Sequence, residues 1–210
     1  MIVSISGLIG SGKDTVASHL VDEHGFKRMS WASSLKDAVS VVFGWDRTML
    51  DGTSKNSREW REQVDPWWAA RLNKPDLTPR WVLQYWGTDV LRRHFHDDIW
   101  VSSLENQLVR TTDNIVITDT RFQNEIEAVK RVSGITVRVT RGENPAWYDS
   151  ALDYNRGPTF SGWSLGKMNL DRLNIHSSEY SHIGLNYDYT ITNDSTIDEL
   201  NRAVNQILVP

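Results

Sequence analysis

The sequence predicts an α/β protein whose sheet is mostly parallel and covered by helices on both faces. Segments with strand patterns alternate with segments of helical spacing along the chain, as is typical of strand–helix–strand crossovers. A glycine-rich turn, residues 7–12, joins the first predicted strand to the first predicted helix. The stretch 45–110 is too rich in helical patterns for a simple crossover, and it indicates an inserted helical lobe.

Short apolar runs predict five strands, at residues 2–6, 26–30, 115–118, 135–140 and 187–192. Helical spacing and cap residues predict the helices. These are expected at 13–24 ended by Gly25, at 35–43 capped by Ser33 or Ser34, within 57–72 interrupted by Pro66, from Thr78-Pro79 onward, after Asp97 or Asp98, at 125–132, and to Leu208 after a capping box at 195–198. Residues 87–89 are expected to break a helix, and residues 142–174 are expected to be loop-like.

Composition excludes several classes of protein. The 210 residues carry a net charge of -4, which argues against duplex nucleic acid, or any stably bound nucleic-acid polymer, as the main partner. The absence of cysteine excludes disulfides and thiolate metal sites. An apolar run of about 18 residues, as a membrane span requires, is absent, and the beginning of the sequence lacks a signal-peptide pattern. We therefore expect a cytoplasmic protein that does not bind membranes.

The turn after the first strand matches the GxxxxGK part of a phosphate-binding loop, or P-loop. Its glycines allow backbone N–H groups to surround a phosphate, and the helix N-terminus adds positive potential. We therefore expect ATP to contact Gly10, Ser11, Gly12, Lys13, Asp14 and Thr15. Asp14 stands where Ser or Thr is usual, so either Thr15 supplies a hydroxyl to Mg²⁺ or Asp14 contributes through water.

Charged groups after the third predicted strand are the next candidates. Asp119 stands where that strand ends, and such strand ends gather catalytic groups in parallel sheets. Asp119 there can hold a Mg²⁺-bound water, and Arg121 can bind a phosphate through two N–H groups. The alternative is a surface turn in which Asp119 caps the next helix. With Lys13, these two residues are the predicted catalytic set.

Five ordered motifs carry a resemblance to a known family. They are SGKDT (11–15), WASSLK (31–36), LQYWGTD (83–89), DTRFQNE (119–125) and HSSE (176–179). In this order they resemble the bacteriophage-type deoxynucleoside monophosphate (dNMP) kinases, and the resemblance extends from residue 2 to about residue 200. The phosphate-binding loop alone is shared by many families, whereas the ordered set is much more specific.

The resemblance implies a nucleoside-monophosphate-kinase-like three-layer fold in one kinase domain. It would have a five-stranded parallel core (about 1–44 and 111–210), a helical acceptor-binding lobe (about 45–110) and a mobile lid (about 142–174). The implied reaction moves the γ-phosphoryl group of ATP to a dNMP with Mg²⁺, giving ADP and a dNDP. Family members are often homodimers, and a phage-encoded member would act in the host-cell cytoplasm. The chain is short for the family, which leaves base selectivity open.

Acceptor-binding residues follow from the resemblance. Arg80 and Gln84 lie four residues apart on one predicted helix face, and the resemblance suggests that they bind the acceptor's phosphate and base; a surface pair is the alternative. The other candidates are Ser33, Lys36, Thr88, Asp89, His176 and Glu179, of which Asp89 could instead cap a helix and Lys36 could be solvated. His176 and Glu179 offer too few ligands for a metal site.

Two further groups of candidates are less specific. Asn193 follows the last predicted strand, where it either borders the adenine of ATP or belongs to a turn. Basic residues of the expected lid could neutralise the transferred phosphoryl group, or could be ordinary surface residues: Arg141, Arg156, Lys167 and Arg172.

Two other functions remain open from the sequence. One is another small-molecule kinase with the same loop, such as a dephospho-coenzyme A kinase, although residues 84–89 and 119–125 fit that family less well. The other is an ATP-binding regulatory or assembly module without transfer activity. The presence of Lys13, Asp119 and Arg121 argues against the second alternative.

Overall fold

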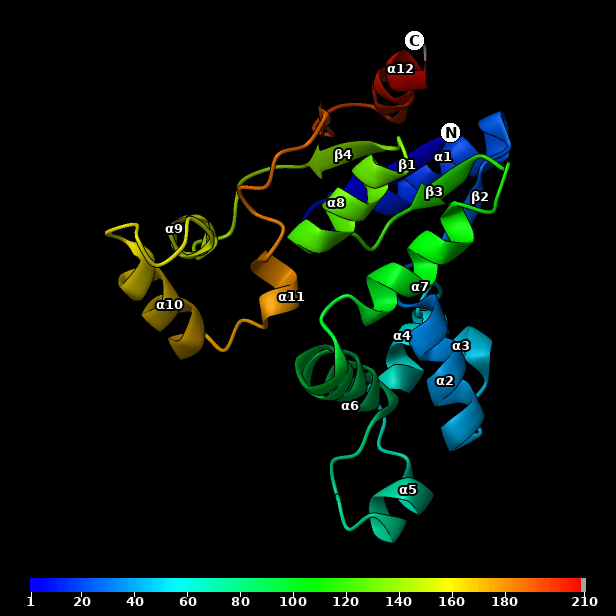
Figure 1. Cartoon of the computed structure of the whole chain (residues 1–210), viewed down its shortest axis with the longest axis vertical. Coiled ribbons are helices and arrows are strands. Elements are labelled where there is room, and N and C mark those ends of the chain that lie inside the picture. Colours follow the sequence, from blue (N-terminus) through cyan, green and yellow to red (C-terminus); the bar gives the residue numbers. More distant parts are fainter. Residues whose placement is uncertain (209–210) are drawn as a thin grey trace. The chain divides into compact units, whose positions relative to one another are not determined.

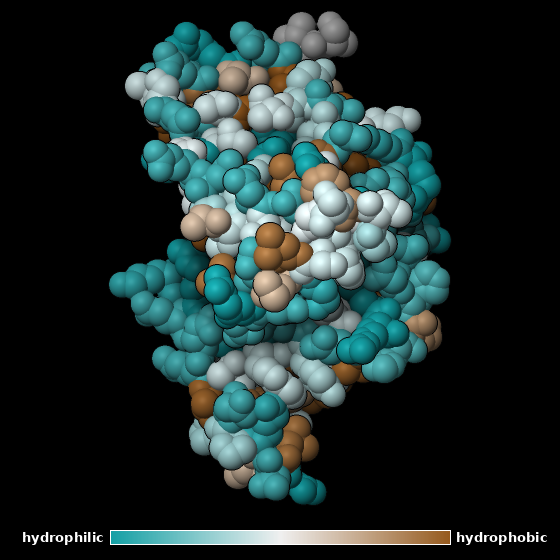
Figure 2. Space-filling view, turned by 90° about the vertical axis from the view of Figure 1, so that its left-hand side faces the viewer, coloured by the Kyte–Doolittle hydropathy of each residue, from teal (hydrophilic) through white to brown (hydrophobic). Residues whose placement is uncertain are grey.

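The computed structural model describes residues 1–208, which form two compact units. The sheet unit comprises Met1–Ser30 and the chain from Leu108 onward, and the helical unit comprises Trp31–Gln107. Figure 1 shows the strands gathered in the first unit, whereas the second contains only helices and their connections. Hydrophilic residues predominate on the face drawn in Figure 2, with apolar residues interspersed among them.

Five parallel strands form the sheet, as the sequence predicts. They are β1 (Ile2–Ser6), β2 (Lys27–Met29), β3 (Ile115–Ile117), β4 (Ile135–Thr140) and β5 (Tyr189–Thr192). Their order is β2-β3-β1-β4-β5, and each neighbouring pair is parallel. The central strand β1 is buried along its whole length. Its apolar residues lie in the core, and its two serines, Ser4 and Ser6, form buried hydrogen bonds with Thr120.

Helices cover both faces of the sheet. On one face, α1 (Lys13–His24) and α12 (Ile197–Leu208) bury Val16, Leu20 and Val204 against Val3 and Ile5 of β1. The helix α8 (Gln123–Arg131) contacts β1 and β4. The boundaries of α1 and the end of α12 are those predicted, and Gly25 ends α1 with a left-handed φ of 68°.

The capping box predicted at residues 195–198 is displaced by one residue. The hydroxyl of Thr196, rather than that of Ser195, accepts a hydrogen bond from the backbone N–H of Glu199 (3.3 Å). The cap side chain lies three residues before its donor, as the motif requires. The sequence pattern therefore located the helix start correctly and misplaced the capping residue.

Residues 142–174 contain two helices, so the prediction of a loop-like segment is wrong. They are α9 (Tyr148–Asn155) and α10 (Trp163–Arg172), followed by the short α11 (Ser177–Tyr180). Their buried side chains, Ala151, Leu170 and Tyr180, share one small core. Gly166 lets α9 and α10 approach closely, because a Cβ there would lie 2.5 Å from the carbonyl oxygen of Ser150. A glycine interpreted as a loop signal thus serves helix packing.

The helical unit is built around tryptophan-rich packing. Its helices are α2 (Ser33–Phe43), α3 (Arg47–Asp51), α4 (Lys55–Arg61), α5 (Pro66–Arg71), α6 (Pro79–Gln84), a π-helix η1 (Tyr85–Phe95) and α7 (Ile99–Leu108). Phe43 stacks on Trp45 with ring centroids 4.5 Å apart, and both rings are buried. The start of α6 is as predicted, since the Thr78 side chain accepts a hydrogen bond from the N–H of Trp81 (3.1 Å).

Two predictions about helix ends in this unit are wrong. Residues 87–89 do not break a helix but lie inside η1. Gly87 is buried, and a Cβ there would lie 2.7 Å from the Leu35 side chain. Its carbonyl accepts a hydrogen bond from Trp100 Nε1 (3.0 Å). Asp89 therefore caps nothing. The helix α2 begins at Ser33 with Ala32 as its N-cap residue, so neither predicted serine is the cap.

Candidate active site

The loop between β1 and α1 has the backbone conformation that its glycines predict. The φ angles of Gly7, Gly10 and Gly12 are +147°, +80° and +103°, values that other residues rarely adopt. Gly12 immediately precedes α1, whose first-turn N–H groups lack partners within the helix. The loop therefore joins a turned backbone to a helix N-terminus, the arrangement that binds phosphate.

Neighbouring strands hold this loop at two glycines. A Cβ at Gly7 would lie 2.2 Å from the carbonyl oxygen of Val139 in β4. A Cβ at Gly12 would lie 2.3 Å from Nδ2 of Asn193, which donates a hydrogen bond to the carbonyl of Ser11 (2.9 Å). Asn193 thus supports the backbone of the phosphate-binding loop, a role that the sequence did not indicate. Its contact with adenine stays a prediction.

Lys13 lies inside the loop rather than in solvent. Its Nζ donates hydrogen bonds to the carbonyls of Gly7 and Leu8, both at 2.8 Å. Burial, followed by the positive charge of Arg121, lowers the pKa of Lys13 from 10.5 to about 8. The negative charges of Asp14 and Glu179 act in the opposite direction on that pKa. A poorly hydrated cation of this kind favours an anion as its ligand.

A buried hydroxyl in the same loop also points to a ligand. Ser11 is 3% exposed, and its Oγ has no hydrogen-bond partner among the described residues. An unsatisfied buried polar atom costs about 1–3 kcal/mol, so such an atom in a native structure calls for an explanation. Together with the glycine conformations and Lys13, it fits a loop that binds phosphate oxygens.

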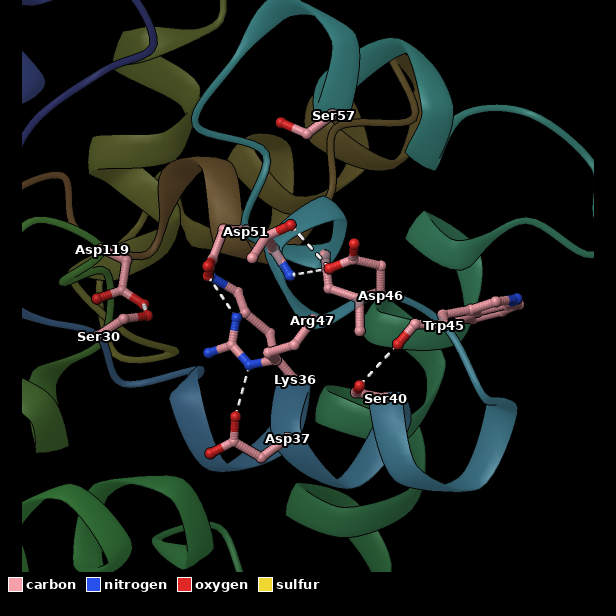
Figure 3. Close-up of polar contacts among 12 residues, drawn as sticks. Ser30, Lys36, Asp37, Ser40, Trp45, Asp46, Arg47, Asp51, Ser57 and Asp119 are labelled. Atoms are coloured by element: carbon pink, nitrogen blue, oxygen red, sulfur yellow. Dashed lines mark hydrogen bonds and ion pairs between the residues drawn. The ribbon is translucent and has the colours of Figure 1, made fainter.

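The three candidate metal ligands lie in different surroundings. Asp14 is exposed and forms an ion pair with Arg28 of β2. Asp119 follows β3 and accepts a hydrogen bond from Ser30 Oγ (2.6 Å), as Figure 3 shows. Thr15 lies in the first turn of α1 and is partly exposed. Residues 1–208 contain no group of three or more His, Cys, Asp or Glu side chains placed to hold a metal ion.

The structure brings together three residues predicted to bind the acceptor. Arg121 Nη1 donates to Glu179 Oε1 (3.0 Å) and to the backbone carbonyl of Ser178 (2.8 Å). His176 is the N-cap residue of α11 and accepts a hydrogen bond from the N–H of Ser178 (3.2 Å). Arg121 and the start of α11 thus form one polar cluster. The part of α11 that carries Glu179 orients the Arg121 guanidinium.

A buried carboxylate fixes the backbone of the turn that carries Arg121. Oε2 of Glu125 accepts hydrogen bonds from the N–H groups of Arg121 (2.7 Å) and Phe122 (3.0 Å). Glu125 is 2% exposed. Its position three residues after the helix cap is a capping-box signal, and this signal identifies a positioning role that our sequence analysis did not assign.

Two ionisable groups near the loop, the buried His182 and the partly buried Tyr187, were missed by sequence reasoning. Burial, followed by the charges of Arg121, Lys13 and Arg138, lowers the pKa of His182 to about 4. Partial burial raises the pKa of Tyr187 to about 12, and its hydroxyl lies within hydrogen-bond distance of the His182 carbonyl (2.9 Å) and Ser6 Oγ (3.1 Å). At neutral pH both side chains are therefore uncharged. No motif marks either residue, because only tertiary packing buries them.

Comparisons with known proteins identify the family. A deoxynucleotide monophosphate kinase of Acanthamoeba polyphaga mimivirus is 32% identical over 155 residues, which cover 67% of this chain and 74% of that protein. This chain belongs to the deoxynucleoside monophosphate kinase family. The deoxynucleoside-5'-monophosphate kinase of Escherichia phage T5 is 25% identical over 182 residues, covering 63% of this chain and 73% of that protein.

Other comparisons add nothing about the activity of this kinase. No protein-family model matches the chain. Among solved structures, a shikimate kinase from Aquifex aeolicus is 15% identical and covers 99% of this chain and 96% of its own, with a TM-score of 0.45. Within residues 1–208, no helix is sufficiently long and apolar to cross a membrane.

The helical unit of this nucleotide kinase carries the remaining acceptor candidates, two of which form ion pairs. Arg80 lies 3.1 Å from Glu62. Lys36 is largely buried and lies 3.1 Å from Asp51, as Figure 3 shows. Gln84, Thr88 and Asp89 follow Arg80 along α6 and η1, and Ser33 begins α2. The structure therefore gathers Arg80, Gln84, Thr88 and Asp89 on one continuous helical segment.

The four cations of the predicted lid belong to the sheet unit and differ in their contacts. Lys167 pairs with Asp171 along α10 (2.6 Å). Arg156 pairs with Asp153 (3.6 Å) and lies over the ring of Phe160. Arg141 directly follows β4, and Arg172 ends α10. Since all four are partly or fully exposed, their part in phosphoryl transfer stays a prediction.

Proposed function

We propose that this protein is an ATP-dependent dNMP kinase that transfers the γ-phosphoryl group of ATP to a dNMP, giving dNDP and ADP. One observation supports the proposal most strongly. The phosphate-binding loop of this family member contains a poorly hydrated lysine and a buried hydroxyl without a hydrogen-bond partner among the described residues. Lys13 and Ser11 provide these groups. Both would gain a partner when triphosphate oxygens enter the loop.

Catalysis of phosphoryl transfer depends mainly on positioning of the two substrates and on positive charge that stabilises the transition state. The N–H groups of residues 10–15 and the Lys13 ammonium would hold the triphosphate. Arg121, oriented by Glu179 and Ser178, would bind phosphate with a planar guanidinium that matches its oxygens. Arg141, Arg156, Lys167 and Arg172 are the cations that could add charge over the transferred group.

The oxygen donors present fit Mg²⁺, which prefers carboxylate, hydroxyl and water ligands. Thr15 and Asp119 would hold the ion, and Asp14 would act through water. When bound, Mg²⁺ would neutralise the negative charge that develops on the phosphate oxygens. The ion pair of Asp14 with Arg28 lessens the repulsion between that carboxylate and the triphosphate.

We assign acceptor recognition in the helical unit to Arg80 for phosphate and Gln84 for the base. Arg80 supplies a guanidinium whose present partner, Glu62, is more than half exposed and so holds it weakly. Gln84 lies one turn further along the same face and offers both a donor and an acceptor. Ser33, Lys36, Thr88 and Asp89 of the same unit, and His176 and Glu179 of the sheet unit, complete the proposed acceptor-binding residues.

An assay of ADP release tests the reaction directly. Purified protein with ATP and Mg²⁺ is given each of the four dNMPs, the corresponding ribonucleotides and dephospho-coenzyme A in turn. We expect release that depends on at least one dNMP. Release that depends only on dephospho-coenzyme A, or on no acceptor, would refute the proposal.

A matched pair of lysine variants links the activity to the loop. Lys13→Ala should abolish dNMP-dependent release while circular dichroism shows an unchanged fold. Lys27→Ala is the control, because Lys27 is an exposed lysine of the same unit whose Nζ lies 2.6 Å from Asp113. Unchanged turnover in Lys13→Ala would show that the loop has been assigned the wrong role.

Thermal shift separates a kinase from a binding module. A ligand at 100 times its dissociation constant stabilises the folded state by about 2.7 kcal/mol. For a kinase, we expect one shift with a non-hydrolysable ATP analogue and a further shift when a dNMP is added. Stabilisation by the ATP analogue alone would favour a protein that binds ATP without transferring it.

A further inference from the structure

Three side chains of types that can bind metal ions converge on the surface of the sheet unit, where α1 contacts α12. His19 and His24 are on α1, and Asn205 is on α12. The Nε2 atoms of both histidines lie 2.8 Å from the same atom, Oδ1 of Asn205. Both rings are half-buried and Asn205 is exposed, so a dissolved ion can reach all three ligands.

The spacing of the two rings matches a pair of imidazoles on one metal ion. Their centroids are 5.2 Å apart, with the ring planes at 77°. In a tetrahedral site with Zn–N distances of about 2.0–2.1 Å, each ring centroid lies about 3.1 Å from the ion, which places the two centroids about 5 Å apart. The observed ring separation therefore matches two imidazoles on one ion, whereas the Nε2–Oδ1 separations of 2.8 Å would have to lengthen by rotation of the exposed Asn205 side chain.

We propose that His19, His24 and Asn205 form a binding site for a divalent transition-metal ion of the zinc or nickel type. Imidazole nitrogen suits these ions, which bind it more readily than Mg²⁺ does. The Asn205 amide oxygen is the third ligand, and water completes the coordination. The site is separate from the Mg²⁺ chemistry of phosphoryl transfer and does not depend on the proposed function.

Metal binding would replace the hydrogen bonds of both rings. Without metal, the Nε2–H of each ring donates to the Asn205 amide oxygen, which has two lone pairs. With metal, the Nε2 lone pair of each ring would bind the ion, and the ring N–H would be at Nδ1. The ion then links the C-terminal end of α1 to α12.

The hydrogen-bonded form and the metal-bound form can be separated by substitution. Glutamine keeps an N–H donor near the position of Nε2 but is a poor ligand for zinc. His19→Gln and His24→Gln therefore preserve the contact with Asn205 while removing one metal ligand each. His94→Gln is the matched control, since His94 is an exposed histidine of the helical unit.

The test is a calorimetric titration of the full chain with ZnCl₂, in nucleotide-free buffer containing Mg²⁺. We expect one zinc ion per chain, at least tenfold weaker binding in each of the His19 and His24 variants, and unchanged binding in the His94 variant. Melting temperatures measured without zinc confirm that each variant is folded. The absence of binding by the wild type, or equal affinity in the wild type and either variant, would overturn the proposal.

A second measurement needs only the wild type. Nitrogen NMR of the imidazoles should show the Nε2 resonances of His19 and His24 shifting on zinc addition, with the Nδ1–H tautomer in the bound state. Titration that leaves both resonances in place would also overturn the proposal.

Discussion

Replacing Gly7 by alanine tests whether β4 closely confines the phosphate-binding loop. The substitution introduces a Cβ that would lie 2.2 Å from the carbonyl oxygen of Val139 and 2.8 Å from Ser11 Oγ. The first contact is with backbone, so it cannot be relieved by turning a side chain. The φ of +147° is itself a conformation that alanine adopts only with strain.

The size of the effect follows from these two terms. Backbone strain of this kind costs about 1–3 kcal/mol, and overpacking a well-packed site costs about 1–3 kcal/mol. We therefore expect Gly7→Ala to lower the free energy of unfolding by about 4 kcal/mol. Gly10→Ala is the matched control, because Gly10 also has a positive φ but a Cβ there meets nothing within 4 Å. Its cost should be about 1–2 kcal/mol.

Amide hydrogen exchange in β1 and β4 is the appropriate assay. Eight of the ten tryptophans lie within residues 31–107, so fluorescence would report mainly on the helical unit. Exchange of the buried strand amides reports on opening of the sheet unit itself. If the losses in free energy of unfolding caused by Gly7→Ala and Gly10→Ala differ by less than about 0.5 kcal/mol, the close approach of Val139 is not the reason for glycine at position 7.

Three further predictions follow. The folded state lowers the pKa of His182 to about 4 and that of Lys13 to about 8. The unfolded chain therefore binds more protons than the folded chain at His182 from pH 4 to 6.5, and at Lys13 from pH 8 to 10.5. The free energy of unfolding should therefore rise with pH by about 3 kcal/mol across each of these two pH ranges. In urea denaturation, the midpoint of His182→Gln should no longer rise with pH in the lower range, and that of Lys13→Met should no longer rise in the upper range. Arg121→Ala should raise the KM for dNMP at least tenfold while the fold stays intact; full activity at low dNMP would contradict the role given to this residue. Asp65→Ala should cost about 2–4 kcal/mol in chemical denaturation followed by tryptophan fluorescence, because its carboxylate caps α5 and accepts from buried Trp45 Nε1 (2.8 Å). In a Trp45→Phe background only the cap term of about 1 kcal/mol should remain.

The sequence predicts those parts of the fold that local rules determine. The run 2–6, the glycine turn and the helix up to Gly25 are specified by neighbouring residues, and the structure has them at the predicted bounds. Segments whose glycines face another helix were predicted wrongly. At Gly87 and Gly166 the missing side chain admits Leu35 and α9, respectively. In a sequence, a glycine that permits helix packing has the same appearance as one that ends a helix.

The candidate site divides in the same way. Lys13 and Asp119 stand at fixed distances from a strand end, so the pattern of the chain around each residue is sufficient to predict its place. His182 and Asn193 come from the distant C-terminal third of the chain, and only the packing of β5 and its preceding loop places them near residues 7–13. Their roles depend on tertiary contacts that no local spacing encodes.

The electrostatics of the loop suit a desolvated lysine to binding an anion. In the folded protein without a ligand, burial and the nearby charge of Arg121 both oppose the ammonium form of Lys13. The desolvation of Lys13 and its repulsion by Arg121 could be relieved only by a more hydrated lysine or a more distant arginine. Either change would weaken the electrostatic field that attracts phosphate. With both substrates bound, the sign of the interaction would reverse, because Lys13 would face the triphosphate and Arg121 the acceptor phosphate in a poorly hydrated site. Placing Lys13 near Arg121 thus lowers the stability of the free protein, and the same arrangement is expected to increase its affinity for nucleotide. This is a trade-off between stability and function of the kind found at active sites.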